Sequence, residues 1–232
     1  MKTALVFVPG LLCERRLWQH QAENLGDLAE PVVADVTGSD TIDGLAHAIL
    51  RAAPDRFFLA GLSLGGYVGL GILRTAPERV MRRALLDTSA RADTPEQTAA
   101  RLELMELAQG GRFEEVPQRL LPSFVHPRRL DEAALTSTVV GMARAIGPEA
   151  FVRQERAIMK RPDARQYLAA ISCPTLVLCG REDAPTPLYL SEELADGIPD
   201  ARLRVIESCG HLSTIERPEE ATAGLREWLE GP

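Results

Sequence analysis

Hydrophobic residues gather in six short runs along the chain, most of them bounded by glycine, proline or aspartate. The runs lie at residues 5–8, 32–34, 57–60, 83–86, 175–179 and 203–206. Hydrophobicity that is continuous rather than alternating is typical of strands buried on both faces, as in a parallel sheet covered by helices. The pattern therefore predicts six buried strands in a mostly parallel sheet.

Apolar residues recur at helical spacing between these runs. One stripe consists of Leu17, Trp18, Gln21, Ala22 and Leu25, and another of Ile42, Leu45, Ala46, Ile49 and Ala53, with Thr41 placed as its N-cap. A third helix is expected to begin directly after Ser63 and to run to about residue 74, and a last one covers 218–229. Strands that alternate with helices at this interval predict a doubly wound α/β sheet with right-handed crossovers.

The interval from Thr88 to Pro174 breaks this alternation. It holds no convincing strand, and its helical patterns cover 95–109, 113–121, 132–146, 149–159 and 163–169. A helical insertion between two parallel strands has to pack outside the sheet, most simply over the carboxyl ends of the strands, where α/β folds bind ligands. We therefore predict a core of residues 1–87 and 175–232, and a helical cap of residues 88–174 over a pocket.

A G-x-S-x-G motif runs from Gly61 to Gly65 with Ser63 at its centre. It follows a predicted buried strand and precedes a predicted helix, which is the setting of a nucleophile elbow. The turn that exposes such a serine leaves no room for side chains two residues to either side, which explains both glycines. We predict that Ser63 is a nucleophile; the alternative is a glycine-rich turn with an incidental serine.

A serine hydroxyl needs a general base, and the chain has four histidines. His20 and His47 fall within predicted helices. His126 in the cap is expected on a surface loop, with a place facing the pocket as the alternative. His211 follows the last predicted strand, on a loop at the carboxyl end of the sheet, where it is placed to meet Ser63. We predict that His211 is the base.

The base in turn needs an acid that fixes its tautomer and stabilises the imidazolium. Asp183 comes directly after the fifth predicted strand and is the predicted acid. Glu182 is its neighbour, and Asp87 is the stronger rival, because it also would lie at the carboxyl edge of the sheet, at the end of the fourth strand. For Asp87 we expect a role in capping or in ordering the hinge of the cap.

The oxyanion that forms when Ser63 attacks a carbonyl group needs two preorganised N–H donors. One expected donor is the backbone amide of Leu64, at the start of the helix after the serine. The loop after the first strand supplies the other, most simply the amide of Leu11.

Composition narrows the range of partners. The 232 residues carry a formal net charge of −7, which disfavours nucleic acid and anionic membranes as partners. No apolar run approaches the roughly 20 residues that span a bilayer. The four cysteines match no zinc or redox spacing, so we expect no metal site, and reduced, mostly buried thiols in a cytoplasmic protein.

Four spaced motifs together resemble the α/β-hydrolase superfamily, above all small bacterial capped esterases and enol-lactonase-like members. They are Pro9-Gly10-Leu11-Leu12-Cys13 with Trp18 downstream, residues 61–65, residues 180–183 with Thr186-Pro187, and Gly210-His211 followed by a Pro-Glu helix. The order Ser63, Asp183, His211 is the order of that superfamily. The resemblance covers nearly the whole chain, and it implies a serine hydrolase that works through an acyl-enzyme without a metal or organic cofactor.

Two features depart from the family pattern. Pro9 stands where the family usually has a histidine, so the oxyanion loop needs a different support. The chain also starts directly at the strand before that loop. This predicts a trimmed sheet of six strands that lacks the N-terminal antiparallel pair and has the 32–34 strand at an edge.

The serine at position 63 excludes the haloalkane dehalogenases and epoxide hydrolases of this superfamily, which need an aspartate there. Hydrolysis of a small carboxylic ester or lactone is the leading prediction. A thioesterase, a C–C bond hydrolase, a lyase and a ligand receptor of the same fold are the alternatives. The cap is rich in leucine and alanine, which favours a small, largely apolar acyl or alcohol group, and both monomer and homodimer stay open.

Overall fold

The computed structural model describes residues 2–231. Its six strands are β1 (Ala4–Val8), β2 (Glu30–Val33), β3 (Phe57–Leu62), β4 (Val80–Leu86), β5 (Thr175–Gly180) and β6 (Arg202–Ile206). They form one sheet in the order β2-β1-β3-β4-β5-β6, and every neighbouring pair is parallel. The predicted six-stranded parallel sheet is confirmed, and the run at 32–34 falls largely in the edge strand β2.

The four inner strands are buried along most of their length, as packing on both faces requires. The prediction of burial on both faces is wrong for β2 and β6, because these strands form the two edges of the sheet. Val32 and Leu203 are exposed there. A short apolar run thus indicates a strand, but it does not indicate the place of that strand in the sheet.

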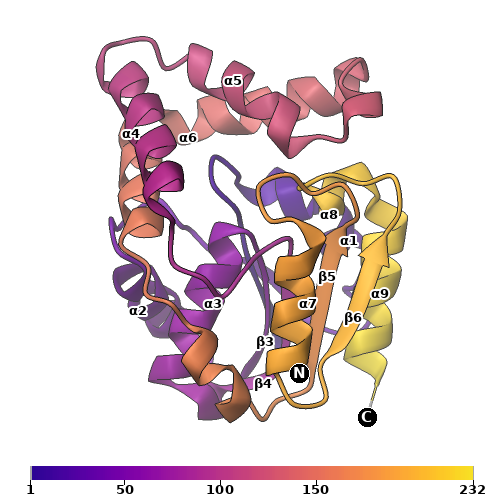
Figure 1. The fold of residues 1–232 in the computed structure, drawn as a ribbon. Coiled ribbons are helices and arrows are strands. Elements are labelled where there is room, and N and C mark those ends of the chain that lie inside the picture. The colour runs from indigo at the N-terminus through magenta and orange to yellow at the C-terminus, as the bar shows by residue number, and fades with distance from the viewer. Residues whose placement is uncertain (1, 232) are drawn as a thin grey trace.

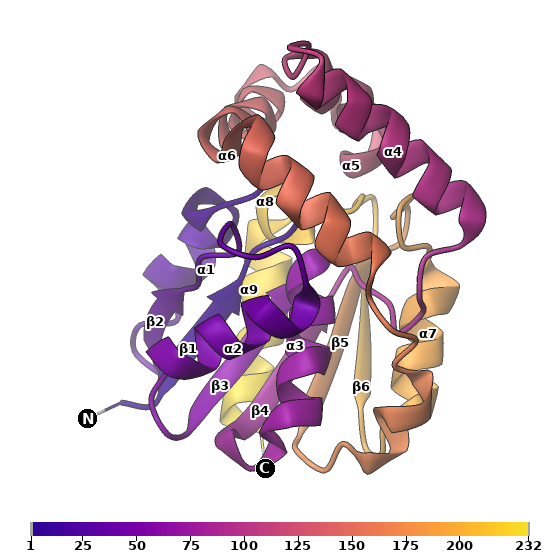
Figure 2. The ribbon, with the colours of Figure 1, turned by 90° about the vertical axis from the view of Figure 1, so that its left-hand side faces the viewer.

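Helices cover both faces of the sheet (Figure 1 and Figure 2). One face carries α2 (Ile42–Ala52), α3 (Leu64–Thr75) and α7 (Leu188–Gly197), and the other carries α1 (Gln19–Asn24) and α9 (Pro218–Glu230), with the short α8 (Ser213–Glu216) beside α9. Because the helices that join parallel strands lie on both sides, the fold is doubly wound, as predicted.

Local sequence accounts for the boundaries of these helices. Thr41 caps α2 as predicted, since its Oγ1 accepts a hydrogen bond from the amide of Gly44 at 3.1 Å. The predicted stripe at 17–25 is divided between a 3₁₀ turn, Arg15–Trp18, and the short α1. Its Trp18 stacks on Phe7 of β1 with 4.6 Å between the ring centroids, which fixes this turn to the sheet.

The chain between β4 and β5 is helical, as predicted. It forms α4 (Pro95–Gln109), α5 (Glu115–Phe124) and α6 (Ala133–Met159), which lie across the carboxyl ends of the strands at the top of Figure 1, and the 3₁₀ turn Arg165–Ala170 leads back to β5. The helices predicted at 132–146 and 149–159 are two arms of α6, joined at Gly147, where φ is 77°. The kink lies there because Pro148 disfavours helical backbone at the residue before it.

Buried apolar side chains of the sheet and of the helices above it form one continuous core. Phe7 and Leu59 of the sheet belong to the same cluster as Met105 of α4 and Phe151 of α6. The upper helices are therefore packed on the sheet as part of the same core. None of the helices within residues 2–231 combines the length and the apolar character that a membrane span requires.

Candidate active site

The winding of the sheet changes direction between β1 and β3, which are neighbours although β2 lies between them in the chain. The helix after β1 lies on one face of the sheet and the helix after β3 on the other. The loops that leave the two strands therefore diverge and open a crevice at the carboxyl edge, where α/β sheets bind ligands. Leu11 on the first loop and Ser63 on the second both line the cavity found there.

Ser63 lies in a strained turn between β3 and α3. Its φ is 54°, in the left-handed region that few residues other than glycine adopt. A Cβ on Gly61 would lie 2.2 Å from the carbonyl oxygen of Gly65, and a Cβ on Gly65 would lie 2.0 Å from the carbonyl oxygen of Val8. Both positions of the motif therefore need glycine, because backbone atoms occupy the space of a side chain.

We expect Gly65→Ala to lower the free energy of unfolding by about 3 kcal/mol, because its methyl group would overlap backbone atoms at the end of β1. Gly69→Ala in the same helix is the matched control, since its Cβ would meet only Leu59, at 3.6 Å. Denaturant unfolding followed by circular dichroism measures both variants. Equal stabilities would contradict this steric explanation of the motif.

The structure brings Ser63, His211 and Asp183 together at the carboxyl edge of the sheet. His211 Nε2 lies 2.9 Å from Ser63 Oγ, and His211 Nδ1 lies 2.9 Å from each carboxylate oxygen of Asp183. Thr186 holds the carboxylate: its amide donates to Oδ1 at 2.9 Å and its hydroxyl donates to Oδ2 at 2.6 Å. With Nδ1–H directed at Asp183, Nε2 of the neutral ring is free to accept the proton of the serine hydroxyl.

The pKa of His211 depends on its buried surroundings. Burial alone would lower this pKa, but the charge and the hydrogen bond of Asp183, together with the carboxyl groups of Asp87 and Glu216, raise it above the usual 6.5. Only the neutral imidazole can accept a proton, and the neutral form is lost as the pH falls through the raised pKa.

We therefore expect kcat/KM for an ester to rise with pH through an apparent pKa above 6.5 and then to level off, because that pKa belongs to His211 in the free enzyme. Initial rates from about pH 5 to 9 at constant ionic strength measure this profile. A profile that is flat over the whole range would contradict the assignment of His211 as the base.

Asp87, the rival acid, has other partners. Its buried carboxyl group accepts hydrogen bonds from the amide of Gly180 at 2.9 Å and from the hydroxyl of Ser213. Asp87 thus joins the end of β4 to β5 and to the segment that follows His211, which differs from the predicted role in capping or in the hinge. Burial, and then the charge of Asp183, raise the pKa of Asp87 well above its usual value.

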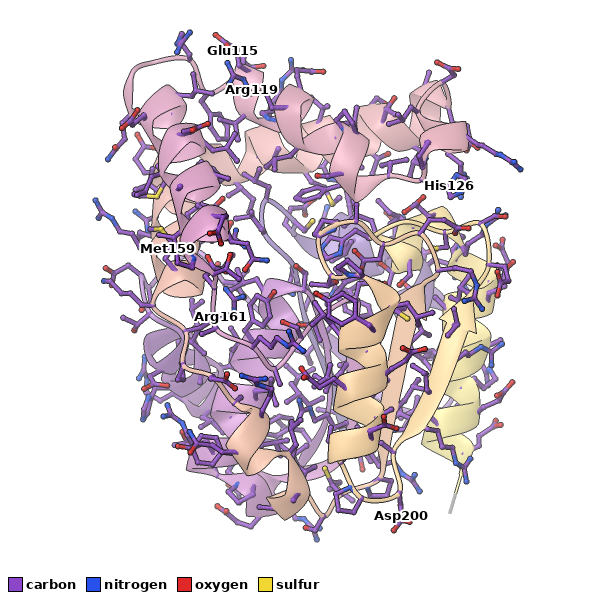
Figure 3. All side chains as sticks on the ribbon, in the orientation of Figure 1. Glu115, Arg119, His126, Met159, Arg161 and Asp200 are labelled. Carbon is purple, nitrogen blue, oxygen red and sulfur yellow. The ribbon has the colours of Figure 1, made fainter. Side chains whose placement is uncertain are left out.

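His126 is buried, so the prediction that it lies on a surface loop is wrong. Its backbone amide donates to Glu216 Oε2 at 2.8 Å, and Glu216 Oε1 accepts from the amide of Leu212 at 3.3 Å. The carbonyl oxygen of Phe124 accepts a hydrogen bond from the amide of His211 at 3.0 Å, and the centroids of the two side-chain rings lie 5.5 Å apart. Residues 124–126 therefore pack directly on the loop of His211, and Figure 3 shows His126 at this junction.

Two further contacts support the loop of His211, and the sequence did not reveal them. Glu182, the neighbour of the predicted acid, accepts a hydrogen bond from the amide of Cys209 at 3.0 Å. Arg217 donates to the carbonyl oxygen of Ser208 from Nε at 3.0 Å and from Nη2 at 2.9 Å. Neither Glu216 nor Arg217 stands in a motif that would have singled it out.

A side chain of α6 supports the loop that carries Leu11. Leu12, with φ at 58°, donates its amide to Gln154 Oε1 at 3.0 Å, and Gln154 Nε2 donates to the carbonyl oxygen of Val36 at 3.3 Å. The buried Gln154 of α6 thus gives the loop the different support that the sequence required. Within residues 2–231, neither the amide of Leu11 nor that of Leu64 donates a backbone hydrogen bond in a loop or turn.

Known proteins are similar to this chain in sequence and in fold. The model of the Alpha/beta hydrolase family matches residues 5–225, nearly the whole chain. The chain belongs to the alpha/beta hydrolase family. It is similar to the pimeloyl-(acyl-carrier protein) methyl ester esterase of Nitrosomonas europaea, with 26% identity over 232 residues that cover 93% of this chain and 91% of that protein.

Two solved structures resemble this alpha/beta hydrolase along its whole length. A thermophilic esterase from Thermogutta terrifontis, solved with malate bound, has a TM-score of 0.89 at 28% identity, covering 98% of this chain and 89% of that one. The enol-lactonase of Burkholderia xenovorans shares the fold, with a TM-score of 0.91 at 22% identity, covering 100% of this chain and 92% of that one. These comparisons confirm the prediction that the protein is a hydrolase.

The cavity of this alpha/beta hydrolase has a volume of about 320 Å³ and is lined by the sheet loops and by the helices above them. Its apolar side includes Leu104 of α4, Leu120 and Phe124 of α5, and Ile158 of α6. Charged side chains also line it, namely Arg91, Arg101, Glu155 and Arg161. The lining is therefore more polar than the leucine-rich composition of this segment predicted, because composition does not tell which side chains face inward.

The cysteines of this alpha/beta hydrolase are free thiols. Burial raises the pKa of Cys13 and of Cys179 to about 12, so these thiols stay protonated at neutral pH and are poor nucleophiles. Within residues 2–231, no three histidine, cysteine, aspartate or glutamate side chains gather in a way that could hold a metal ion.

Proposed function

We propose that this protein is a serine hydrolase that cleaves a small carboxylic ester or lactone through an acyl-enzyme. Ser63 is the nucleophile, His211 the base and Asp183 the acid that orients it. The proposal rests on the hydrogen-bonded series from Ser63 Oγ through His211 to Asp183 on the wall of the cavity. Such a series gives a weak hydroxyl nucleophile its base and gives the base a buried counter-charge.

In the first half-reaction, Ser63 Oγ attacks the carbonyl carbon of the ester while its proton passes to His211 Nε2. The carbonyl oxygen takes up the electron pair, and the oxyanion accepts hydrogen bonds from the amides of Leu11 and Leu64. The imidazolium, stabilised by Asp183, then donates its proton to the alcohol oxygen as the C–O bond breaks. The acyl group stays on Ser63, and in a lactone the alcohol stays attached to it.

In the second half-reaction, a water molecule takes the place of the alcohol. His211 Nε2 removes a proton from this water, and the oxygen adds to the acyl carbon with the oxyanion again held by the two amides. When the intermediate collapses, the proton returns to Ser63 Oγ and the carboxylic acid leaves. One histidine serves both steps because Asp183 and Thr186 keep its ring in one orientation.

We infer that residues 88–174 act as a cap on a core of residues 1–87 and 175–232. Leu104, Leu120 and Phe124 of this segment line the same cavity as Ser63, so the segment bounds the space in which a substrate lies. The cytoplasmic location and the choice between monomer and homodimer stay predictions from the sequence.

Labelling with a serine-directed fluorophosphonate, measured by intact mass, tests the proposal. We expect one label per chain, and none on the Ser63→Ala variant, because only an activated serine attacks the phosphorus. Enzyme that has not been treated with the label is then assayed with esters, lactones, thioesters and substrates of C–C bond hydrolases. A folded protein that takes no label would overturn the proposal and favour a lyase or a ligand receptor of the same fold.

A further inference from the structure

The cavity that holds Ser63 is also lined by charged side chains that the proposed reaction does not use. They are Arg101 of α4, Glu155 of α6 and Arg161, which lies just after α6. Asp93 forms ion pairs with both arginines. We call these four residues the ion cluster. Figure 3 shows Arg161 below the upper helices, on the side of α3.

The carboxylates of the ion cluster hold the two arginines in place. Asp93 Oδ2 accepts from Arg101 Nε at 2.7 Å, and Asp93 Oδ1 accepts from Arg161 Nη1. Glu155 Oε2 accepts from Arg101 Nη1 at 2.7 Å. The side chains of Asp93 and Glu155 are 2% and 0% exposed, so these contacts are shielded from water and fix the guanidinium planes.

Arg161 is fixed further by its surroundings. Its Nε donates to the carbonyl oxygen of Arg91 at 2.8 Å and its Nη1 to that of Ile158 at 3.0 Å. Its guanidinium lies 4.3 Å from the centroid of the Tyr67 ring. Tyr67 is four residues after Ser63, so it lies on the same side of α3, about one helical turn away. The ion cluster is therefore about one helical turn beyond the nucleophile.

Each arginine keeps one terminal nitrogen, Nη2, that makes no hydrogen bond within residues 2–231. Neither nitrogen is among the fully buried polar atoms that lack a partner, and both residues line the cavity. Two N–H donors on arginines that share one carboxylate suit the two oxygens of a ligand carboxylate.

The charges of the ion cluster favour a carboxylate over a more highly charged anion such as phosphate. Two arginines against Asp93 and Glu155 give a neutral cluster when all four are ionised, so binding depends on directed N–H donors rather than on excess positive charge. Burial raises the pKa of Glu155, and the charge of Arg101 opposes this shift. A doubly charged phosphate would need more donors than the two that are free.

We propose that the substrate carries a free carboxylate, bound by Arg101 and Arg161, at the end remote from the scissile carbonyl group. The inference rests on the proposed function and narrows its substrate class to monoesters of dicarboxylic acids and to lactones that bear a carboxylate.

Two matched series of substrates test this inference on the intact protein. One consists of the monomethyl esters of succinic, glutaric, adipic and pimelic acid, and the other of the methyl esters of the monocarboxylic acids of equal length. We expect kcat/KM at the best length to favour the charged ester at least tenfold, and this ratio to fall below threefold in Arg101→Gln.

Two further variants separate recognition from folding. Arg101→Gln leaves Glu155 without its partner, so the double variant Arg101→Gln/Glu155→Gln, which removes one charge of each sign, checks that the loss does not come from an unpaired buried charge. Arg119→Gln is the matched control, because Arg119 is an exposed arginine of α5 that pairs with Glu115 on the outer surface (Figure 3). It should keep the full preference.

Two results would overturn the inference and leave the ester-hydrolase proposal intact. One is a wild-type protein that hydrolyses both series equally well at every length. The other is a preference for the charged esters that survives in both Arg101 variants. Failure of every ester in both series, with no fluorophosphonate labelling, would instead overturn the proposed function and this inference with it.

Discussion

Replacement of His211 by alanine is expected to lower kcat for ester hydrolysis by roughly 10⁴- to 10⁶-fold, because the hydroxyl of Ser63 then loses the base that lies 2.9 Å away. Labelling by the fluorophosphonate should slow as well, since the same hydroxyl has to be activated. Steady-state rates with a chromogenic ester and the time course of labelling by intact mass measure the two effects.

His47→Ala is the matched control for this experiment. His47 lies on α2 and is exposed, and its Nδ1 is hydrogen-bonded to the carbonyl oxygen of Asp43 at 2.7 Å. Its loss should therefore leave the rate unchanged. Circular dichroism shows whether both variants are folded. A normal rate in His211→Ala, or an equal loss in His47→Ala, would contradict the proposed base.

Asp183→Asn is expected to lower kcat by about 10⁴-fold, because the amide neither fixes the tautomer of His211 nor stabilises the imidazolium. Asp87→Asn is its counterpart and should cost less than about tenfold in kcat. The carboxyl group of Asp87 bonds to Gly180 and Ser213, and the amide oxygen of asparagine can keep the first of these bonds.

The two variants are compared by kcat and by the pH profile of kcat/KM. In Asp183→Asn we also expect the apparent pKa of His211 to fall, since the charge that raises it is gone. A larger loss in Asp87→Asn than in Asp183→Asn would identify Asp87 as the acid.

The sequence predicted those features that depend on short stretches of chain. Gly61, Ser63 and Gly65 lie within five residues, and the backbone contacts that exclude side chains there are made within the same turn or with the adjacent strand β1. That Asp183 and His211 lie beside Ser63 could be predicted because each is on a loop that follows a parallel strand, and all such loops meet at one edge of the sheet.

Features that depend on contacts between distant segments were missed. Glu216 binds the amide of His126, 90 residues away, and Gln154 binds that of Leu12, 142 residues away. Neither pairing leaves a periodic or local signal. The arginines that line the cavity were missed for a related reason: which side of an amphipathic helix faces a cavity depends on how the helix is rotated on its neighbours, and composition does not record this.

The hydrogen bonds from the upper helices to the loops beneath them bear on how such enzymes are re-engineered. Gln154 holds the loop of Leu11, Phe124 holds the backbone of His211, and His126 shares Glu216 with the same loop. A chimera that exchanged these helices for those of a relative, in order to change specificity, would also remove three supports of the loops that carry Leu11 and His211. Turnover would then fall for every substrate alike, unless the graft kept these three positions as part of the recipient scaffold.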